Sequence, residues 1–345
     1  MVAAEVFNND NIIQVRLQHG AITVETINIG CAITAIYAPD RHGISENIVA
    51  GYSDLSCYNV NKDYLGVIIG RYANRIERGS FLLDDEHYQL SINDGDNHLH
   101  GGIHGFGHKS WQLVNTKKDD EKCSVRFCYN SPDGEEGYPG ALLVFAEYAL
   151  DSRGRLFLNY SATSNKATPV NLTNHSYFNL TGFKNPAILE HKLMIDANLF
   201  TEKNKDDTSS GKISAVDNTA LDFRHSKKIV DGIDQFPLDL GYNHNFILNK
   251  EKNNALSRAA VLSEDESGRV LTVYTDQPAM QVYTANYWDG TVTGSQGCHY
   301  ERHGGIALET QAYPGSVNHP HFPTTILRPG GQYQSTTIFE FGIEY

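Results

Sequence analysis

The sequence predicts an all-β protein that folds as one large antiparallel β-sandwich over residues 1–345. Runs rich in Val, Ile, Thr, Tyr and Phe recur from one end of the chain to the other, and such residues favour strands. Several neighbouring runs alternate apolar and polar residues across a short turn, as β-hairpins do. Sustained 3.6-residue periodicity is missing. The nearest helix candidates, residues 53–60 and 231–236, would form one or two turns.

The predicted strands follow one another along the chain. Residues 12–40 contain three β-branched runs punctuated by glycine, which predict a meander. Hairpins are then expected at Asp84-Asp85, around Gly154 and around Gly268, each between alternating apolar positions. Because strand signals continue to the C-terminus without a Pro-, Ser- or Gly-rich linker or a repeat, we expect a single domain.

Composition and charge exclude several classes of protein. Hydrophobic residues make up 40% of the chain and charged residues 20%, which is typical of ordinary globular proteins. The net charge is −13, from 41 acidic and 28 basic residues spread along the chain, and no basic cluster suits a phosphate backbone. We therefore expect no nucleic-acid partner.

The sequence gives no sign of an export signal or a membrane-spanning segment. The first ten residues, "MVAAEVFNND", have neither a basic nor an apolar signal region, and no stretch approaches 18 consecutive apolar residues. We therefore expect a cytoplasmic protein without a membrane partner. The odd number of scattered cysteines predicts free structural thiols: Cys31, Cys57, Cys123, Cys128 and Cys298. Two glycosylation sequons, at Asn171 and Asn179, fall in an apolar stretch and are interpreted as chance matches.

Residues 168–180, "TPVNLTNHSYFNL", combine three Asn and one His with apolar residues. A side-chain amide buried without a hydrogen-bonding partner costs about 1–3 kcal/mol, so a strand built only to pack would not contain so many. We interpret the stretch as a polar floor under a ligand. Four other segments combine polar and aromatic residues in the same way, which favours a pocket assembled from several strands: 70–79, 97–102, 241–248 and 307–323.

Several histidines of these segments are candidate metal ligands. On a strand, His98 and His100 would share one face and could ligate a metal ion. No HExxH motif, cysteine pair or suitably spaced carboxylate completes such a site, so neutral, hydrogen-bonded imidazoles are the favoured interpretation. His319 and His321, in a proline-punctuated loop, are still weaker candidates.

Two charged residues stand out in these segments. Arg75 follows Asn74 at the end of an apolar run, and either a surface salt bridge worth under about 1 kcal/mol or a site role explains it. Glu309 directly follows an apolar strand segment, where an ionised carboxylate is costly unless it is paired or functional. Glu309 is therefore a candidate site residue.

From about Gly30 to the C-terminus, the chain resembles the aldose 1-epimerases, also called galactose mutarotases. The motifs that carry the resemblance occur in the family's order: "IGRYANRI", "NHLHGG", "SPDGEEGYPG", "TPVNLTNHSYFNL", "GYNHNFIL", "QPAMQVYTAN" and "LETQAYPGSVNHPHFP". The resemblance implies a β-sandwich with a shallow sugar cleft and no cofactor.

The resemblance also implies roles for individual residues. His175 would be the general acid, Glu309 the general base, and His100 would hydrogen-bond the sugar. The cleft would be lined by Asn74, Arg75, Tyr177 and Gln281. The family's usual motif near residue 243 is Gly-aromatic-Asp-His, whereas this chain has "GYNH", so Asn243 stands where an Asp would contact sugar hydroxyls. This departure leaves the preferred sugar open.

Interconversion of α and β anomers explains the need for these residue types. The C1 hydroxyl must lose a proton and the ring oxygen must gain one, so that the ring opens, C1–C2 rotates and the ring closes. A carboxylate is a competent base and an imidazolium, with a reference pKa of about 6.5, a competent acid. We therefore expect a mutarotase of hexoses such as galactose and glucose, without metal.

Three alternatives remain open from the sequence. A mutarotase with another preference, such as fructose or a less usual aldose, would use the same chemistry. A glycosidase would need two carboxylates about 5–9.5 Å apart, and the shared motifs contain one. A non-catalytic carbohydrate-binding sandwich would need only aromatic and amide residues. We expect a monosaccharide substrate and a monomer or weak homodimer.

Overall fold

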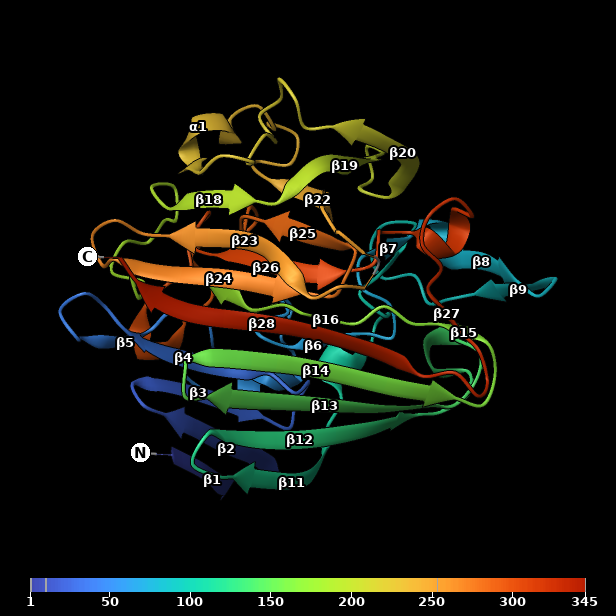
Figure 1. Ribbon diagram of the computed structural model, residues 1–345. Coiled ribbons are helices and arrows are strands. Elements are labelled where there is room, and N and C mark those ends of the chain that lie inside the picture. Colours follow the sequence, from blue (N-terminus) through green and yellow to red (C-terminus); the bar gives the residue numbers. More distant parts are fainter. Residues whose placement is uncertain (1, 10, 253, 345) are drawn as a thin grey trace.

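The computed structural model describes residues 2–9, 11–252 and 254–344, and nearly all of its regular structure is antiparallel strand (Figure 1). The predicted all-β sandwich is thus confirmed. Within those residues no helix has the length and apolar character needed to cross a membrane. The helical elements are one α-helical turn, α1 (Val230–Ile233), and six 3₁₀ turns at Leu55–Asn59, Glu77–Gly79, Phe106–His108, Glu135–Gly137, Ser295–Gly297 and Ser316–Asn318.

The first sheet is the predicted N-terminal meander, extended by a strand at each edge. Its five strands pair in chain order: β1 (Val2–Asn9), β2 (Ile12–His19), β3 (Ile22–Ile27), β4 (Ile33–Pro39) and β5 (Ser45–Asn47). Val15 and Leu17 on β2 and Val24 on β3 are fully buried, so the alternation along these strands places one face against the core.

The largest sheet has nine strands and crosses the molecule, with its four longest strands side by side: β12 (Lys122–Ser131), β13 (Leu142–Asp151), β14 (Arg155–Ser164) and β28 (Tyr333–Ile343) (Figure 1). In spatial order its strands are β11 (Gln112–Lys118), β12, β13, β14, β28, β24 (Arg269–Thr275), β23 (Ser257–Ser263), β18 (Lys192–Ile195) and β21 (Lys227–Lys228). The predicted hairpins around Gly154 and Gly268 join β13 to β14 and β23 to β24.

A six-stranded sheet carries much of the site. Its spatial order is β17 (Tyr177–Phe178), β26 (Ile306–Gln311), β25 (Ala279–Tyr283), β22 (Asn243–Leu248), β19 (Ala197–Lys203) and β20 (Ser209–Ala215). The other strands form two-stranded pairs: β7 (Arg75–Ile76) with β10 (His98–Leu99), β6 (Ile68–Ile69) with β16 (Thr173–Asn174), β15 (Thr168–Pro169) with β27 (Ile326–Leu327), and β8 (Ser80–Leu83) with β9 (Glu86–Gln89). The last pair is the hairpin predicted at Asp84-Asp85.

The main hydrophobic core joins the six-stranded and nine-stranded sheets. Val282 and Leu308 from the first and Leu158 and Val273 from the second belong to one buried cluster. Each fully buried side chain of this size contributes roughly 1.5–3 kcal/mol through removal of apolar surface from water. The core therefore holds the six-stranded sheet rigidly from behind.

The opposite face of the six-stranded sheet is polar, because strand alternation separates the two kinds of side chain. Gln281 on β25 is directly paired with Glu309 on β26, and Asn243 on β22 is paired with Tyr283 on β25. Directly paired residues point to the same side of a sheet. Register alone therefore gathers these four polar side chains on one face.

Residues 168–180, interpreted from the sequence as a polar floor, do not form one continuous strand. They form three two-residue strands, β15, β16 and β17, each paired with a different partner. All thirteen residues are buried, including Asn171 and Asn179, so the sequons are inaccessible. The side-chain amides explain the breaks, since Asn174 donates to Gly66 O and Asn179 to Gly304 O in place of ladder bonds.

Candidate active site

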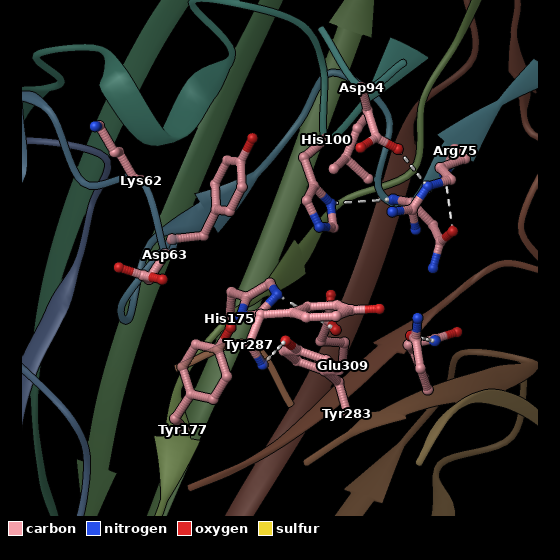
Figure 2. Close-up of a pocket in the computed structure, with 15 residues that line it drawn as sticks. Lys62, Asp63, Arg75, Asp94, His100, His175, Tyr177, Tyr283, Tyr287 and Glu309 are labelled. Atoms are coloured by element: carbon pink, nitrogen blue, oxygen red, sulfur yellow. Dashed lines mark hydrogen bonds and ion pairs between the residues drawn. The ribbon is translucent and has the colours of Figure 1, made fainter. Parts of the chain in front are cut away.

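A cavity of about 290 Å³ opens over the polar face of the six-stranded sheet (Figure 2). Its size lies at the lower end of the range for small-molecule pockets, which suits a single sugar ring. All eight residues singled out in the sequence line it: Asn74, Arg75, His100, His175, Tyr177, Asn243, Gln281 and Glu309. Residues far apart in the chain are thus brought into one pocket.

His175 and Glu309 form the buried centre of this cavity. His175 Nε2 lies 3.5 Å from Glu309 Oε1, and the two side chains are 4% and 2% exposed. His175 Nδ1 and Glu309 Oε2 are both buried and have no hydrogen-bond partner among the described residues. Buried polar atoms are normally paired, so these two atoms are available to a ligand.

Burial shifts both pKa values strongly. It raises the pKa of Glu309 to about 8, with the Arg75 charge acting in the opposite direction, and it lowers the pKa of His175 to about 4. Both shifts disfavour the charged form, as expected for desolvated groups. Contact between an imidazolium and a carboxylate favours both charges, so it opposes the effect of burial when the proton moves from Glu309 to His175.

The backbone fixes the position of His175. Its N–H donates to Val67 O, and its carbonyl accepts from the Gly66 N–H, at 2.9 and 3.0 Å. The imidazole packs between aromatic rings, with ring centroids 4.8 Å from Tyr177 and 6.0 Å from Tyr64. Its orientation is therefore set before a ligand arrives.

His100 faces His175 with its ring nearly perpendicular, the centroids being 5.4 Å apart. The backbone N–H of Asn74 donates to His100 Nδ1 at 3.3 Å. Burial, followed by the His175 charge, holds the pKa of His100 well below its usual value, so the ring is neutral. With Nδ1 accepting, the proton of the neutral ring is on Nε2, and His100 offers a hydrogen-bond donor to the cavity.

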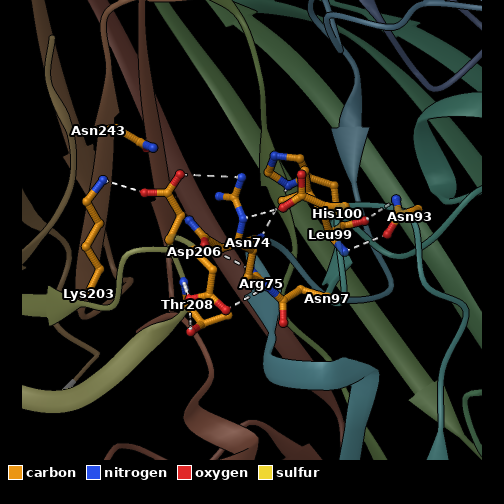
Figure 3. Close-up of polar contacts among 12 residues, drawn as sticks. Asn74, Arg75, Asn93, Asn97, Leu99, His100, Lys203, Asp206, Thr208 and Asn243 are labelled. Carbon is orange, nitrogen blue, oxygen red and sulfur yellow. Dashed lines mark hydrogen bonds and ion pairs between the residues drawn. The ribbon is translucent and has the colours of Figure 1, made fainter. Parts of the chain in front are cut away.

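Arg75 is held by two carboxylates rather than lying on the surface (Figure 3). Its Nε donates to Asp94 Oδ2 at 2.6 Å, and its Nη2 lies 3.8 Å from Asp207 Oδ2. Lys203 pairs with Asp207 and also with Asp239. The guanidinium is only 16% exposed, so this network keeps a positive charge at the edge of the cavity.

Asn243 and Gln281 are joined side chain to side chain on neighbouring strands. Gln281 Nε2 donates to Asn243 Oδ1 at 2.7 Å. This bond uses the acceptor of the Asn243 amide and leaves its Nδ2 as a donor. An Asp at this position would keep a second oxygen as an acceptor. The polarity of this wall is thus opposite to that of the family's usual motif.

The His98 and His100 side chains do not share one side, so the metal site considered from their spacing is not formed. His98 Nε2 bonds to Tyr138 Oη and its Nδ1 to Ser91 O, at 2.6 and 2.7 Å. His100 has a φ of 52°, which turns it away from strand alternation and toward the cavity. His319 and His321 instead hydrogen-bond the carbonyls of residues 209 and 211.

A different set of possible metal ligands is created by the fold. Ligand atoms of His100, His175 and Glu309 lie within 4.8 Å of one another. A ligating imidazole normally donates its second N–H to an acceptor, whereas His100 Nδ1 faces the N–H donor of Asn74. The surroundings of His100 therefore favour hydrogen bonding to a ligand over metal coordination.

Sequence reasoning missed nearly half of the cavity wall. The additional lining residues are Lys62, Asp63, Tyr64, Asp94, Leu99, Tyr283 and Tyr287. Tyr283 could have been found, because it lies two residues after Gln281 on the same strand and therefore points to the same side. Leu99 lies on the two-residue strand β10 and the others come from loops, so no periodicity in the sequence marks them.

Comparison with known proteins gives a consistent result. The family profile of aldose 1-epimerase matches residues 14–340. The chain is 43% identical to galactose mutarotase of Bos taurus over 331 residues, which cover 95% of this chain and 93% of that protein. It is 36% identical to aldose 1-epimerase of Escherichia coli over 330 residues, 94% of this chain and 93% of that protein.

Solved structures agree. A galactose 1-epimerase from Lactobacillus acidophilus superposes with a TM-score of 0.86 at 28% identity, over the whole of both chains. An aldose epimerase homologue from C. elegans gives a TM-score of 0.87 at 26% identity, over 99% of this chain and 100% of that one. The chain therefore belongs to the aldose 1-epimerase family, whose members are isomerases that interconvert sugar anomers.

Proposed function

We propose that this chain interconverts the α and β anomers of hexoses such as galactose and glucose, with Glu309 as general base and His175 as general acid. The observation that carries the proposal is the 3.5 Å contact between His175 Nε2 and Glu309 Oε1 at the buried centre of a polar cavity. Both oxygens that exchange protons in the reaction are bonded to C1. An acid and a base that serve them must therefore lie close together.

The proton movements balance within this pair. Glu309 takes the proton of the C1 hydroxyl while His175 protonates the ring oxygen, so the C1–O5 bond breaks and an aldehyde forms. After rotation about C1–C2, Glu309 returns its proton to the aldehyde oxygen and His175 recovers its own as the ring closes. No atom is lost and no carbon changes its oxidation state overall, so the reaction requires no cofactor.

The proton shared by Glu309 and His175 is on one residue before the sugar binds and on the other when the reaction begins. With a pKa of about 8 for Glu309 and about 4 for His175, the proton of the empty site is on Glu309. A bound pyranose favours the state in which this proton is on His175. The C1 hydroxyl donates to the carboxylate and the ring oxygen accepts from the imidazolium, and both bonds favour the charged forms. Arg75 adds to this by lowering the pKa of Glu309.

The rest of the cavity is proposed to orient the sugar. His100 offers its Nε2–H, and Arg75 offers guanidinium donors held in place by Asp94. Tyr177 supplies an aromatic surface beside His175. The remaining hydroxyl contacts are assigned to Asn74, Asn243 and Gln281.

Polarimetry tests the proposal directly. Freshly dissolved α-D-galactose, α-D-glucose, fructose and less usual aldoses are followed with and without enzyme, after subtraction of the solvent rate. We expect accelerated equilibration with galactose and glucose. Binding of these sugars without acceleration would make the chain a carbohydrate-binding protein, and release of monosaccharide from a glycoside would make it a hydrolase.

A further inference from the structure

The cavity contains one carboxylate that the proposed mechanism does not use. Of the three that line it, Glu309 is the proposed base and Asp94 is paired with Arg75. The third, Asp63, is partly buried, and no hydrogen bond or ion pair holds its carboxylate within the described part of the chain. An acid that faces a cavity without a partner is costly, and a ligand that donates a hydrogen bond removes that cost.

The segment that carries Asp63 is fixed by a buried asparagine. Asn61 Oδ1 accepts from the Leu65 N–H at 2.8 Å, and Asn61 Nδ2 donates to Leu65 O at 3.1 Å. The Tyr64 N–H donates to Asn61 O and closes the turn. Asp63 is therefore presented to the cavity by a rigid turn, as a preorganised ligand contact requires.

Asp63 lies across the cavity from Arg75. Figure 2 shows the two residues on opposite sides of the pair His175 and Glu309. Burial is the main cause of the raised pKa of Tyr177 and of Tyr283, and the nearby Asp63 charge adds a smaller increase to both. Burial, followed by repulsion from Asp289, raises the pKa of Asp63 itself, and the charge of the neighbouring Lys62 acts in the opposite direction.

We propose that Asp63 accepts a hydrogen bond from a substrate hydroxyl on the side of the sugar away from Arg75, and so contributes to sugar preference. The proposal rests on the proposed function. In this chain the wall at residue 243 carries a neutral amide, whose acceptor is already used by Gln281. A charged acceptor for substrate hydroxyls is instead present at Asp63, on the side of the cavity away from Arg75.

The first test compares Asp63→Asn with the wild type in the polarimetric assay. We expect KM for the preferred sugar to rise roughly five- to fiftyfold, because a charge-assisted hydrogen bond is replaced by a weaker one to a neutral amide. The kcat should change less than about twofold, since a hydroxyl away from C1 is bound equally in ground and transition states. Asp289→Asn is the matched control, as it removes a nearby acid that does not line the cavity. An equal rise in KM in both variants would overturn the proposal that Asp63 contacts the sugar directly.

The second test identifies the hydroxyl. Monodeoxy derivatives of the preferred sugar are assayed with wild type and Asp63→Asn. One derivative should show a raised KM with wild type but a much smaller rise with the variant, because both changes act on the same bond. Equal penalties for every derivative in both proteins would refute the proposal.

Thermal unfolding separates binding from support of the turn. Because the described residues give Asp63 neither a hydrogen bond nor an ion pair through its carboxylate, and its pKa is raised, Asp63→Asn should keep or raise Tm at neutral pH. A lower Tm together with a raised KM would overturn the proposal in favour of a structural role. Failure of the proposed function is distinct, since the wild type itself would then not accelerate mutarotation.

Discussion

Glu309 Oε1 and His175 Nε2 lie 3.5 Å apart, although no sequence motif joins the strand that ends in Gln311 to the segment around His175. β17 pairs with β26 and sets this distance through the register of Tyr177 with Ala307. Both side chains are nearly inaccessible to water, and each keeps a polar atom with no partner among the residues that the structure describes, which is costly for folding. This arrangement is typical of a site whose chemistry needs perturbed groups.

The first prediction concerns this pair. Glu309→Gln and His175→Asn should each lower kcat for galactose at least about 10²-fold, because each removes one proton-transfer partner. Both replacements remain polar and close in size, so Tm should stay near that of the wild type. Retained activity in either variant that folds normally would refute the assignment.

The second prediction is a bell-shaped pH dependence of kcat/KM. The reaction needs one proton on the pair. With a pKa of about 4 for His175 and about 8 for Glu309, the pair holds one proton between about pH 4 and pH 8. Below that window a second proton removes the base, and above it loss of the last proton removes the acid. Polarimetric initial rates at a series of pH values, corrected for the solvent rate, measure both the acid and the alkaline limb of the pH profile. A profile that stays flat down to about pH 3 would contradict the prediction.

The strands could be predicted from sequence because their signals are local. Alternation and turn residues identified the hairpins at Asp84-Asp85, Gly154 and Gly268, and the short helical candidates became single turns. Prediction from the alternation of residues failed where the backbone leaves the extended strand conformation. The two-residue period would place His98 and His100 together, but the positive φ of His100 separates them.

The site could be predicted only in part. Residues of types that acid-base chemistry needs were identified through the family resemblance, and the fold places them in one cavity. Contacts made in space were not visible, such as the ion pair of Arg75 with Asp94. Asp63 was missed for the same reason, since nothing in its sequence neighbourhood distinguishes a cavity-facing acid from a solvated one.

The third prediction tests how Arg75 is held. Asp94→Asn replaces the charged partner of the 2.6 Å bond, so Arg75 should lose its fixed position and KM for galactose should rise roughly three- to tenfold, with a smaller change in kcat. Steady-state polarimetry measures both constants. Asp133→Asn is the control, because Asp133 pairs with the exposed Lys166 and does not line the cavity. An unchanged KM for Asp94→Asn would show that Arg75 needs no anchor.

The fourth prediction is that the enzyme needs no metal ion. Dialysis against a chelator should leave kcat, KM and Tm unchanged, because the Asn74 N–H at His100 Nδ1 opposes coordination through Nε2. The control is the same dialysis followed by added zinc. A loss of activity that zinc restores would instead establish a metal site at His100, His175 and Glu309.

The fifth prediction concerns Asn243. In Asn243→Asp one carboxylate oxygen can still accept from Gln281 Nε2, while the other replaces the Asn243 donor with a charged acceptor facing the cavity. Bonds from hydroxyls to a carboxylate are about twice as strong as those to a neutral amide. We therefore expect KM for galactose or glucose to fall roughly three- to tenfold.

In that variant kcat should change little, because contacts away from C1 bind ground and transition states alike. Asn243→Ala is the control, since it removes the donor without adding an acceptor and should not lower KM for these sugars. If Asn243→Asp leaves KM unchanged for every sugar tested, the contact at residue 243 does not determine sugar preference. Asp63 would then be the remaining candidate for that role.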